Sequence, residues 1–518
     1  MRILIAGRRE GLGGALVAAL AHRHDVRMLE HGGGDPRHPD AAAVAAQEFE
    51  TVVLAPPFVG PDASDGEILD AAARGTYNLL TQAPAARFIL LSSLRTLERY
   101  PWNYRVSEQW APRPSADVKS LAPHLAELVA RELSRVRPIQ AIALRLGEVV
   151  DDRHASRHPP DASWLHIEDA VQAVERALAF EPPANGPQTG WWVFHIPGGG
   201  HKTRFPLALA GSPLFGYRPQ HDLSAGAKLP PPQPPIGTHK HLDAKAGYRP
   251  QRVVIYGAGG PVAAVTTEAL ARDHILRLTD RRPLAEIVSE NQPPTPGRPS
   301  PRLLGPPHEI ACVDVTDAEK VLQAARGMDA MINCTVVRDQ PEQAFQVNVV
   351  GVYNMLRAAL ACEIRRFVQT GPPQGCTPLY SDPTNYGYDY DISAEAPARP
   401  GNDLYNLTKF LGQEICRIFA DVHGIETPVL TFAGLVDPQG PGHDAEREHP
   451  WLTAWEDVGA AMRQALIVPS FPRVFEVMQI CSDTPHGRFS NEKARRLLGW
   501  EPRHRMERYW LRSHGPAG

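Results

Sequence analysis

Residues 252–263 read RVVIYGAGGPVA, a short apolar run that ends in a cluster of glycines. Such a run is typical of a buried parallel strand, and the glycines indicate a tight turn into a helix. The small residues Gly257, Gly260 and Ala263 let the backbone turn, approach a pyrophosphate and pack the new helix on the sheet. The stretch therefore predicts the strand–turn–helix start of a dinucleotide-binding domain.

Acidic residues near the ends of the next strands strengthen this prediction. The run 275–280, ILRLTD, places Asp280 about 20 residues beyond the glycines, where a carboxylate binds ribose hydroxyls and repels a 2′-phosphate. NAD is therefore the expected cofactor and NADP the less favoured one, although two arginines follow Asp280 directly. Asp314, at the end of the expected third strand, and Asn333 complete the cofactor-binding candidates of this half. The alternative is a domain of the same fold that binds no nucleotide.

The first half of the chain shows the same order of landmarks. Residues 2–7, RILIAG, lead into a glycine loop that is one residue longer, and Glu30 and Asp35 take the places of the two acids. The candidate cofactor residues of this loop are Gly7, Gly11 and Gly13. Three bulky residues, Arg8-Arg9-Glu10, interrupt the glycines, so nucleotide binding by the first half stays open.

Further pairs of segments continue the repeat to the end of both halves. The matching segments are 75–80 with 351–356, 87–91 with 366–370, 144–147 with 431–434, 167–170 with 455–458, and 214–219 with 497–502. Alternating strands and helices in both halves predict an α/β fold with two tandem Rossmann-like, doubly wound parallel sheets. Each sheet is expected to carry a small C-terminal substrate lobe.

The expected domains are residues 1–220 and 251–518, joined by a proline-rich linker over residues 221–250. The linker includes KLPPPQPP at 228–235, a stiff and extended sequence. Gly-Tyr-Arg-Pro occurs twice, at 216–219 and again just before the second domain, and the sequence leaves open which copy ends the first domain.

The sharpest catalytic signal is Tyr405-Asn406-Leu407-Thr408-Lys409. A tyrosine and a lysine four residues apart share one face of a helix. The ammonium stabilises the phenolate and lowers a pKa that ordinarily lies near ~10, so that the tyrosine can exchange a proton with a substrate. The pair follows the fifth expected strand of a dinucleotide fold, where hydride moves to or from a nicotinamide.

The whole pattern resembles the extended short-chain dehydrogenase/reductases, the NAD-dependent epimerase/dehydratase family. The resemblance covers nearly all of both halves and rests on the glycine loops, on Tyr405 with Lys409, and on residues 348–351, 456–458 and 490–502. It implies that Tyr405 is the acid/base and that Lys409 also holds the nicotinamide ribose. It further implies a Ser or Thr near the end of the fifth strand that orients the substrate oxygen, and substrates that are often sugars or nucleotide sugars.

The second half departs from this family at the substrate-orienting hydroxyl. Aligned on the fifth strand, the family's serine falls at Pro372, which has no hydroxyl. Thr370, Thr377 or Ser381 would have to replace it, and we take Thr370 as the candidate.

The first half departs from the family at the tyrosine and the lysine. An alignment of Glu127 with Glu414 places Val118 at the tyrosine and Ala122 at the lysine. The first half is therefore predicted to be a degenerate copy, with a structural or regulatory role.

These features predict an NAD-dependent oxidoreductase or epimerase with one working site, in residues 251–518. Only 12 residues separate Pro438 from Trp451, which favours a compact substrate such as a free sugar, a uronate or a lactone. The rival interpretation is a non-catalytic nucleotide-binding sensor or scaffold with the same fold.

Apolar stripes on two helices suggest a reason to keep the first copy. One stripe lies on the helix from about Leu121 to Leu133, and a similar one follows Leu407 in the second half. If both stripes are shared, the halves form an intramolecular pseudo-dimer; the alternative is that each stripe only covers its own sheet.

Composition excludes several other classes of protein. The 518 residues include 54 Lys and Arg and 58 Asp and Glu, so the net charge of −4 offers no basic surface for nucleic acid. No apolar run is long enough to cross a membrane and no signal peptide is evident, which predicts a cytoplasmic protein. The six cysteines form no zinc-type spacing, so we expect buried thiols and no metal site.

Overall fold

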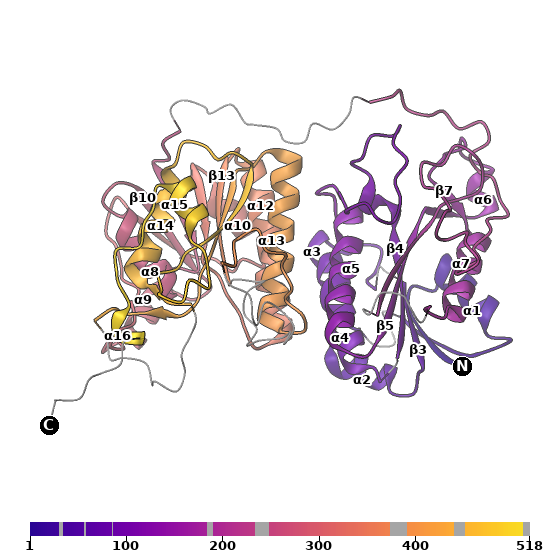
Figure 1. The fold of residues 1–518 in the computed structure, drawn as a ribbon, viewed down its shortest axis with the longest axis horizontal. Coiled ribbons are helices and arrows are strands. Elements are labelled where there is room, and N and C mark those ends of the chain that lie inside the picture. Colours follow the sequence, from indigo (N-terminus) through magenta and orange to yellow (C-terminus); the bar gives the residue numbers. More distant parts are fainter. Residues whose placement is uncertain are drawn as a thin grey trace. The chain divides into compact units, whose positions relative to one another are not determined.

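The computed structural model describes residues 1–30, 35–55, 58–84, 86–183, 190–233, 248–372, 391–439 and 451–510, without the side chains of residues 44–46, 508 and 510. The chain divides into two compact units, residues 1–238 and 239–518 (Figure 1). No helix in the described part of the chain is long and apolar enough to span a membrane.

The second unit is built on a seven-stranded sheet with the order β11-β10-β9-β12-β13-β14-β17, and all neighbouring strands run parallel. Its strands and helices are β9 (Arg252–Tyr256), α8 (Pro261–Leu270), β10 (Ile275–Asp280), α9 (Leu284–Glu290), β11 (Glu309–Cys312), α10 (Ala318–Ala325), β12 (Ala330–Asn333), α11 (Pro341–Phe345), η3 (Gln346–Val350), α12 (Gly351–Ala361), β13 (Arg366–Gly371), α13 (Leu404–His423), β14 (Thr427–Thr431), β15 (Leu435–Val436), β16 (Thr453–Ala454), α14 (Trp455–Ile467), β17 (Phe475–Gln479), α15 (Glu492–Leu498) and α16 (Glu507–Trp510). Helices α8 and α14 pack together, and α12 packs with both α10 and α13. The apolar run that opened the sequence argument is the central strand β9, whose residues Val253, Val254 and Ile255 are fully buried.

The first unit has a six-stranded parallel sheet with the order β2-β1-β3-β4-β5-β8. Its elements are β1 (Arg2–Gly7), α1 (Leu12–Leu20), β2 (Asp25–Leu29), α2 (Pro39–Ala46), β3 (Thr51–Ala55), α3 (Asp65–Asp70), η1 (Ala71–Gly75), α4 (Thr76–Gln82), β4 (Arg87–Ser93), η2 (Leu94–Leu97), α5 (Val118–Val136), β5 (Gln140–Leu146), β6 (Glu148–Val150), α6 (Asp152–Ala155), β7 (Trp164–His166), α7 (Ile167–Ala179) and β8 (Trp191–Ile196). Within its described residues the sheet has no counterpart of β11. The two parallel α/β sheets confirm the predicted fold class.

Several polar contacts recur in both units at positions that the sequence repeat pairs. The side-chain amide of Asn78 donates to the carbonyls of Pro36 and Arg37, and that of Asn354 donates to the carbonyls of Val315 and Thr316. Each asparagine lies on the helix that follows a π-helical turn, α4 after η1 in the first unit and α12 after η3 in the second. Its side chain therefore holds the equivalent turn against the equivalent helix in each unit.

A second recurring contact shows which Gly-Tyr-Arg-Pro ends the first repeat. Asp169, in the first turn of α7, accepts hydrogen bonds from the backbone N–H groups of Gln220 and His221 at 2.8 and 3.1 Å. Asp457 accepts the equivalent pair from the segment after α15, at 3.0 and 3.2 Å. The copy at 216–219 therefore corresponds to the C-terminal turn of the second unit.

The predicted linker 221–250 begins as part of the first unit. Lys202 Nζ donates to the carbonyl of Ala227 at 2.8 Å, and the N–H of Gln233 donates to Asn103. Near its end, the ring of Tyr248 lies 4.4 Å from the Arg366 guanidinium of the second unit. The boundaries at 220 and 250 stay predictions.

The cysteines largely follow the prediction of buried, unpaired thiols. Cys334, Cys416 and Cys481 are buried and Cys362 is half-buried, all of them free. Cys312 is exposed, so the prediction was wrong there: β11 lies at the edge of its sheet. Cys376 lies outside the described residues.

Candidate active site

Helix α13 carries the predicted catalytic pair. The Asp403 carboxylate caps the helix by accepting the N–H of Asn406 at 2.7 Å, which fixes where the first turn begins. Tyr405 therefore lies in the first turn, half-buried, and Lys409 lies one turn further in, 2% exposed.

The Lys409 ammonium is held by two backbone carbonyls. Its Nζ donates to Thr335 O at 2.9 Å and to Thr370 O at 3.2 Å, so it connects the ends of β12 and β13 to α13. Burial lowers the pKa of Lys409 to about 8, because an ammonium loses its hydration there. An ammonium with a pKa this close to neutrality is suited to respond to a proton moving on the neighbouring phenol.

Polar groups at the ends of the central strands shape the floor of the site. Asn333, at the end of β12, donates to Gln369 Oε1 at 2.9 Å and accepts from the N–H and hydroxyl of Thr335. Asn333 is fully buried, and both ends of its side-chain amide are hydrogen-bonded within the protein. In this arrangement the predicted cofactor-binding residue holds the loop after β12.

The structure places the candidate hydroxyl of Thr370 inside the sheet. Its Oγ1 donates to Asn333 O at 2.8 Å, and the side chain is buried. What Thr370 offers the site in this arrangement is its carbonyl, which accepts from Lys409. The two other candidates, Thr377 and Ser381, lie outside the described residues, and Pro372 directly follows the strand.

The glycine loop of the second unit is built for a close approach of the backbone. Gly257 has φ +80°, and a Cβ there would lie 2.9 Å from backbone atoms of the loop after β12. Helix α8 begins with Pro261, its N-cap Gly260 gives no side-chain cap, and Ala263 is buried in its first turn. Uncapped N–H groups at a helix start suit a pyrophosphate, so these residues fit a dinucleotide.

Asp280 ends its strand as predicted, whereas Asp314 lies two residues beyond the end of β11. Asp280 ends β10, and its Oδ2 accepts the N–H of Gly259 at 2.9 Å, which ties the carboxylate to the glycine loop. Asp314 follows β11, and its Oδ1 accepts the N–H and hydroxyl of Thr316. Asp280 Oδ1 accepts only a long hydrogen bond from the N–H of Arg282 at 3.4 Å, and the two hydrogen bonds to Asp314 leave its Oδ2 for contact with ribose or adenine.

The glycine loop of the first unit differs in its polar partners. Gly11 caps α1 with φ +69°, Gly7 ends β1, and a Cβ on Gly13 would overlap the carbonyl oxygen of Arg8. The Glu30 carboxylate, the counterpart of Asp280, accepts a hydrogen bond from Arg9 Nε at 2.6 Å. The loop's own arginine therefore pairs with the carboxylate that corresponds to Asp280.

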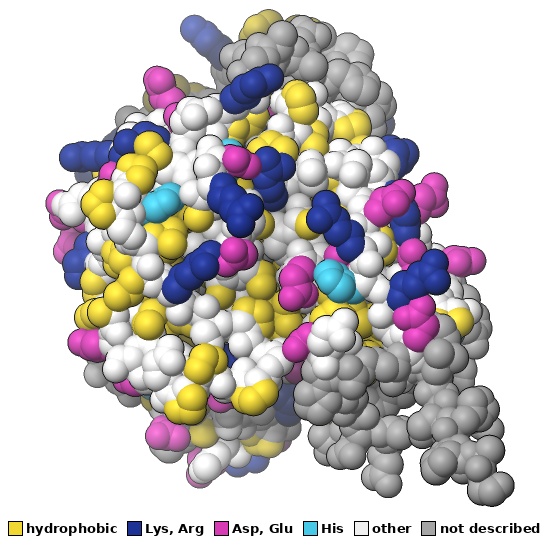
Figure 2. All heavy atoms as spheres, turned by 90° about the vertical axis from the view of Figure 1, so that its left-hand side faces the viewer, with side chains coloured by type: hydrophobic (Ala, Val, Ile, Leu, Met, Phe, Trp, Pro, Cys, Tyr) yellow, Lys and Arg dark blue, Asp and Glu magenta, His cyan; other side chains and the backbone are white. Residues whose placement is uncertain are grey.

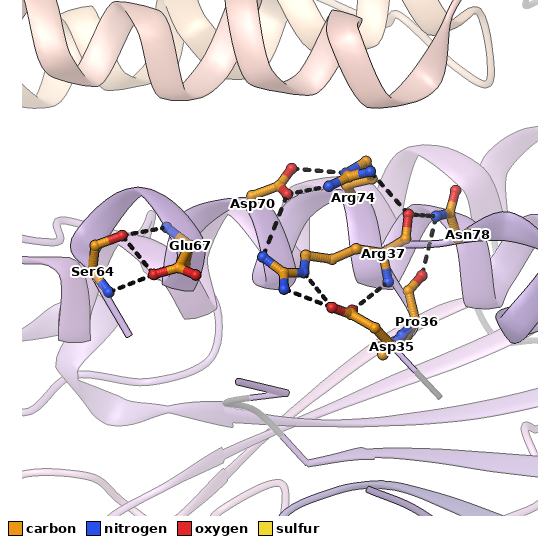
Figure 3. A network of polar contacts seen from close by, with 8 residues as sticks. All are labelled: Asp35, Pro36, Arg37, Ser64, Glu67, Asp70, Arg74 and Asn78. Atoms are coloured by element: carbon orange, nitrogen blue, oxygen red, sulfur yellow. Dashed lines mark hydrogen bonds and ion pairs between the residues drawn. The ribbon is translucent and has the colours of Figure 1, made fainter. Parts of the chain in front are cut away.

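The second acid of the first unit is also paired within the chain. Asp35 accepts hydrogen bonds from Arg37 Nε and from the N–H of Arg37, and Figure 3 shows this guanidinium between Asp35 and Asp70. Burial alone would raise the pKa of Asp35. The hydrogen bonds from Arg37 outweigh burial and lower that pKa. Arg74 and Asn78 both donate to the carbonyl of Arg37 and complete the network in Figure 3.

The structure corrects the alignment of α5 with α13 by one residue. Asp117 caps α5 as Asp403 caps α13, and the strand pairs Arg87↔Gln140 and Arg366↔Glu426 fix the other end of each segment. The same number of residues separates each cap from its strand position, so no gap is needed. The counterparts of the catalytic pair are therefore Lys119 and Pro123, and the prediction of Val118 and Ala122 was wrong. The error came from aligning Glu127 with Glu414, because the structure pairs Glu127 with Gln413.

A buried ion pair occupies the carboxyl edge of the first sheet instead. Arg145 on β5 donates to both oxygens of Glu127 on α5, at 2.9 and 2.7 Å, and Ser92 donates to the same carboxylate. Burial would raise the pKa of Glu127, but Arg145 overrides it and lowers that pKa. Burial, followed by the charge of Arg145, lowers the pKa of His195 to about 3, so this imidazole is neutral.

One group of possible metal ligands comes together among the described residues. It consists of His166, Glu168 and His221 in the first unit. His166 Nδ1 accepts the N–H of Glu168 at 3.3 Å, and His221 Nδ1 lies 3.3 Å from Asp169. These contacts give both imidazoles a role in holding the start of α7, and we assign no metal to them.

Surface charge does not gather into a single-sign field on the face seen in Figure 2. Lysine and arginine side chains alternate there with acidic and hydrophobic ones. This mixed surface is in line with the small net charge.

Sequence reasoning missed Arg338 and Thr335, and used Asn348 only as a marker for a helix start. All three lie on or contact the loop after β12, where a dinucleotide fold places its ligands. A charged residue five positions after a buried strand was the available signal for Arg338.

Residues 253–453 match the sequence model of the NAD dependent epimerase/dehydratase family. L-arabinose 1-dehydrogenase (NAD(P)(+)) of Haloferax volcanii is 25% identical over 270 residues, 49% of this chain and 96% of that protein. NAD-dependent glucose-6-phosphate dehydrogenase of the same organism is 24% identical over 262 residues, 49% of this chain and 93% of that protein. The crystal structure of uronate dehydrogenase from Agrobacterium tumefaciens is 24% identical, covers 50% of this chain and 86% of that chain, and has a TM-score of 0.40.

Proposed function

We propose, from the match of residues 253–453 to the NAD dependent epimerase/dehydratase family, that the second unit is an NAD-dependent dehydrogenase that oxidises a hydroxyl of a compact sugar. The observation that carries the proposal is the Tyr405–Lys409 pair at the start of α13, with the Lys409 ammonium buried and held by the ends of two central strands. A solvated helix face would not bury a lysine in this way.

The cofactor would be held by the glycine loop, by Asp280 and by Asp314. NAD bound there supplies the hydride acceptor. Tyr405 accepts the proton of the substrate hydroxyl as the carbonyl forms, because the nearby positive charge of Lys409 stabilises its phenolate. The carbonyls of Thr335 and Thr370 keep the Lys409 ammonium in place while the proton moves.

The names of the relatives support a sugar substrate. One relative is named for L-arabinose and another for glucose 6-phosphate, both of them single sugars, and both are dehydrogenases. The stretch between Pro438 and Trp451 is short, which also favours a compact substrate.

The first unit, in this proposal, neither binds NAD nor transfers a proton. Its two cofactor acids, Glu30 and Asp35, are paired with Arg9 and Arg37, and Lys119 and Pro123 stand at the catalytic positions. Pro123 has no ammonium to stabilise a phenolate, and Lys119 provides no phenol at the position of Tyr405. The pairing of α5 and α13 in a pseudo-dimer stays a prediction.

A second candidate function is a non-catalytic NAD-binding sensor. Pro372 favours it, because the position after β13 from which a hydroxyl would orient the substrate has none.

The test is the reduction of NAD, followed by its absorbance, with a panel of aldoses, sugar acids and sugar phosphates. The dehydrogenase predicts NADH formation with at least one single sugar. NAD binding without NADH formation for the whole panel would instead favour the sensor.

A further inference from the structure

We propose that Arg338 is a substrate-binding residue that holds an anionic group, a carboxylate or a phosphate, of a sugar whose reacting hydroxyl lies at Tyr405. This inference rests on the proposed function and adds the chemical class of the substrate. Its basis is the position of the guanidinium, whose Cζ lies 5.1 Å from the centre of the Tyr405 ring.

The backbone that carries Arg338 is fixed by a buried side chain. Asn348, in the π-helical turn η3, donates to Val337 O at 2.8 Å and to Thr408 Oγ1 at 3.0 Å. Asn348 is 1% exposed, and it joins the residue before Arg338 to the same helix that carries Tyr405. The guanidinium and the phenol are therefore held relative to each other by one short chain of contacts.

The Arg338 side chain is exposed and forms no ion pair with any described carboxylate. Two other arginines of this unit are paired, Arg282 with Glu290 and Arg302 with Glu268. A guanidinium over the face of an aromatic ring keeps its N–H groups directed outward in its plane. Those N–H groups can donate two parallel hydrogen bonds to a carboxylate or a phosphate. Hydrogen bonds to a neutral sugar hydroxyl are weaker.

The pyrophosphate of the cofactor is an alternative source of the same anionic chemistry. The two sources predict different kinetic changes, because loss of a substrate contact raises the KM for the sugar, whereas loss of a cofactor contact raises the KM for NAD. The glycine loop and the start of α8 already provide the N–H groups for a pyrophosphate, which favours the substrate as the partner of Arg338.

The experiment compares Arg338→Gln, Arg338→Lys and Arg302→Gln with the unaltered full chain. The Arg302 variant removes an equal charge from the same unit, away from Tyr405. Binding of glucuronate and of glucose 6-phosphate is measured by calorimetry on protein saturated with NADH, which cannot accept a hydride and so prevents turnover. The kcat/KM with NAD is measured for these sugars and for glucose and arabinose.

We expect Arg338→Gln to weaken binding of at least one of the two anionic sugars by about 10- to 100-fold, the range for a lost hydrogen bond to a charged group. Arg338→Lys should retain part of the affinity, and Arg302→Gln should behave as the unaltered chain. The KM for NAD and any kcat/KM for glucose or arabinose should change less than threefold.

Three results in Arg338→Gln would each contradict the role of Arg338 as the substrate-binding residue. They are equal losses of kcat/KM for neutral and anionic sugars, unchanged binding affinity for both anionic sugars, or a raised KM for NAD. None of these results would affect the proposed dehydrogenase. Conversely, binding of an anionic sugar that depends on Arg338, without any NADH formation, would support the anion site and contradict the dehydrogenase.

Discussion

In both units one row of three residues crosses the carboxyl edge of the sheet. In the first unit the row is Ser92↔Arg145↔His195, and in the second it is Gly371↔Thr431↔Gln479. The helix over each row adds Glu127 in the first unit and Gln413 in the second.

The first unit fills this row with a buried salt bridge between Arg145 and Glu127. The matching row of the second unit and Gln413 carry no charge, and the buried Lys409 ammonium is held by two backbone carbonyls. A compensated internal ion pair has no unsatisfied charge to offer a ligand, whereas an ammonium held by neutral carbonyls can still act on a reacting group. In the proposed function, this difference in a few side chains separates a structural unit from a reactive one.

The largest effect is expected at the catalytic tyrosine. Tyr405→Phe should lower kcat by about 10²- to 10⁴-fold, the usual contribution of an acid/base group, while NAD affinity stays within a few-fold. The matched control is Lys119→Ala, at the counterpart position in α5, which should leave turnover unchanged. Steady-state kinetics and NAD titration check both, and activity of Tyr405→Phe within tenfold of the original would remove Tyr405 from the acid/base role.

The next effect tests the buried ion pair of the first unit. Glu127→Gln installs the residue of the second unit and leaves Arg145 buried without its counter-charge, which should lower the free energy of unfolding by about 3–5 kcal/mol. Glu127→Gln combined with Arg145→Thr recreates the neutral pair of the second unit and should recover much of that loss. Denaturant unfolding measures the cycle; additive losses in the double variant would mean that the two side chains do not stabilise each other.

Lys409 should produce a pH dependence of stability. Burial lowers the pKa of this ammonium in the folded state to about 8, against 10.5 for the free side chain. Between these values the unfolded chain binds more protons, so stability rises with pH, and the charge destabilises the fold most below pH 8.

Relative to Lys409→Met, the unaltered chain should therefore gain about 3 kcal/mol of unfolding free energy between pH 8 and pH 10.5. Unfolding measured at several pH values gives this difference. A constant difference across the range would show that the pKa of Lys409 is the same in the folded and the unfolded chain.

The smallest effect concerns the choice of cofactor. Asp280→Ala should weaken NAD by about 1.5–3 kcal/mol, the worth of a hydrogen bond to a charged group, and relax discrimination against NADP. Glu30→Ala, the counterpart in the first unit, should change neither the affinity for NAD nor the affinity for NADP, because Arg9 is already paired with that carboxylate. Titration with both cofactors tests the pair, and equal affinities of the unaltered chain for NAD and NADP would remove the argument from Asp280.

Sequence alone was sufficient for the elements whose signals are local. The glycines at 257 and 260 and the acid at 280 mark a strand–turn–helix unit by composition, and the spacing of Tyr405 and Lys409 defines one helical face. Each of these lies on the predicted element.

The partners of those residues depend on contacts between distant segments, which no local pattern encodes. The carbonyls that hold Lys409 come from 39 and 74 residues away, and the Arg145–Glu127 pair spans 18 residues and two elements. The register of α5 was misjudged because Glu127 was aligned with Glu414, whereas the Asp117 cap aligns Glu127 with Gln413. Arg338 was overlooked because its relation to Tyr405 arises only when the loop after β12 meets α13.

The central claim is that the chain has one working dinucleotide site, in its second unit. Calorimetric titration of the full chain with NAD tests it most directly, together with Gly257→Val, whose side chain would overlap the backbone after β12. The account predicts one NAD bound per chain and none in the Gly257→Val variant. Two NAD per chain, or undiminished binding by that variant, would contradict it.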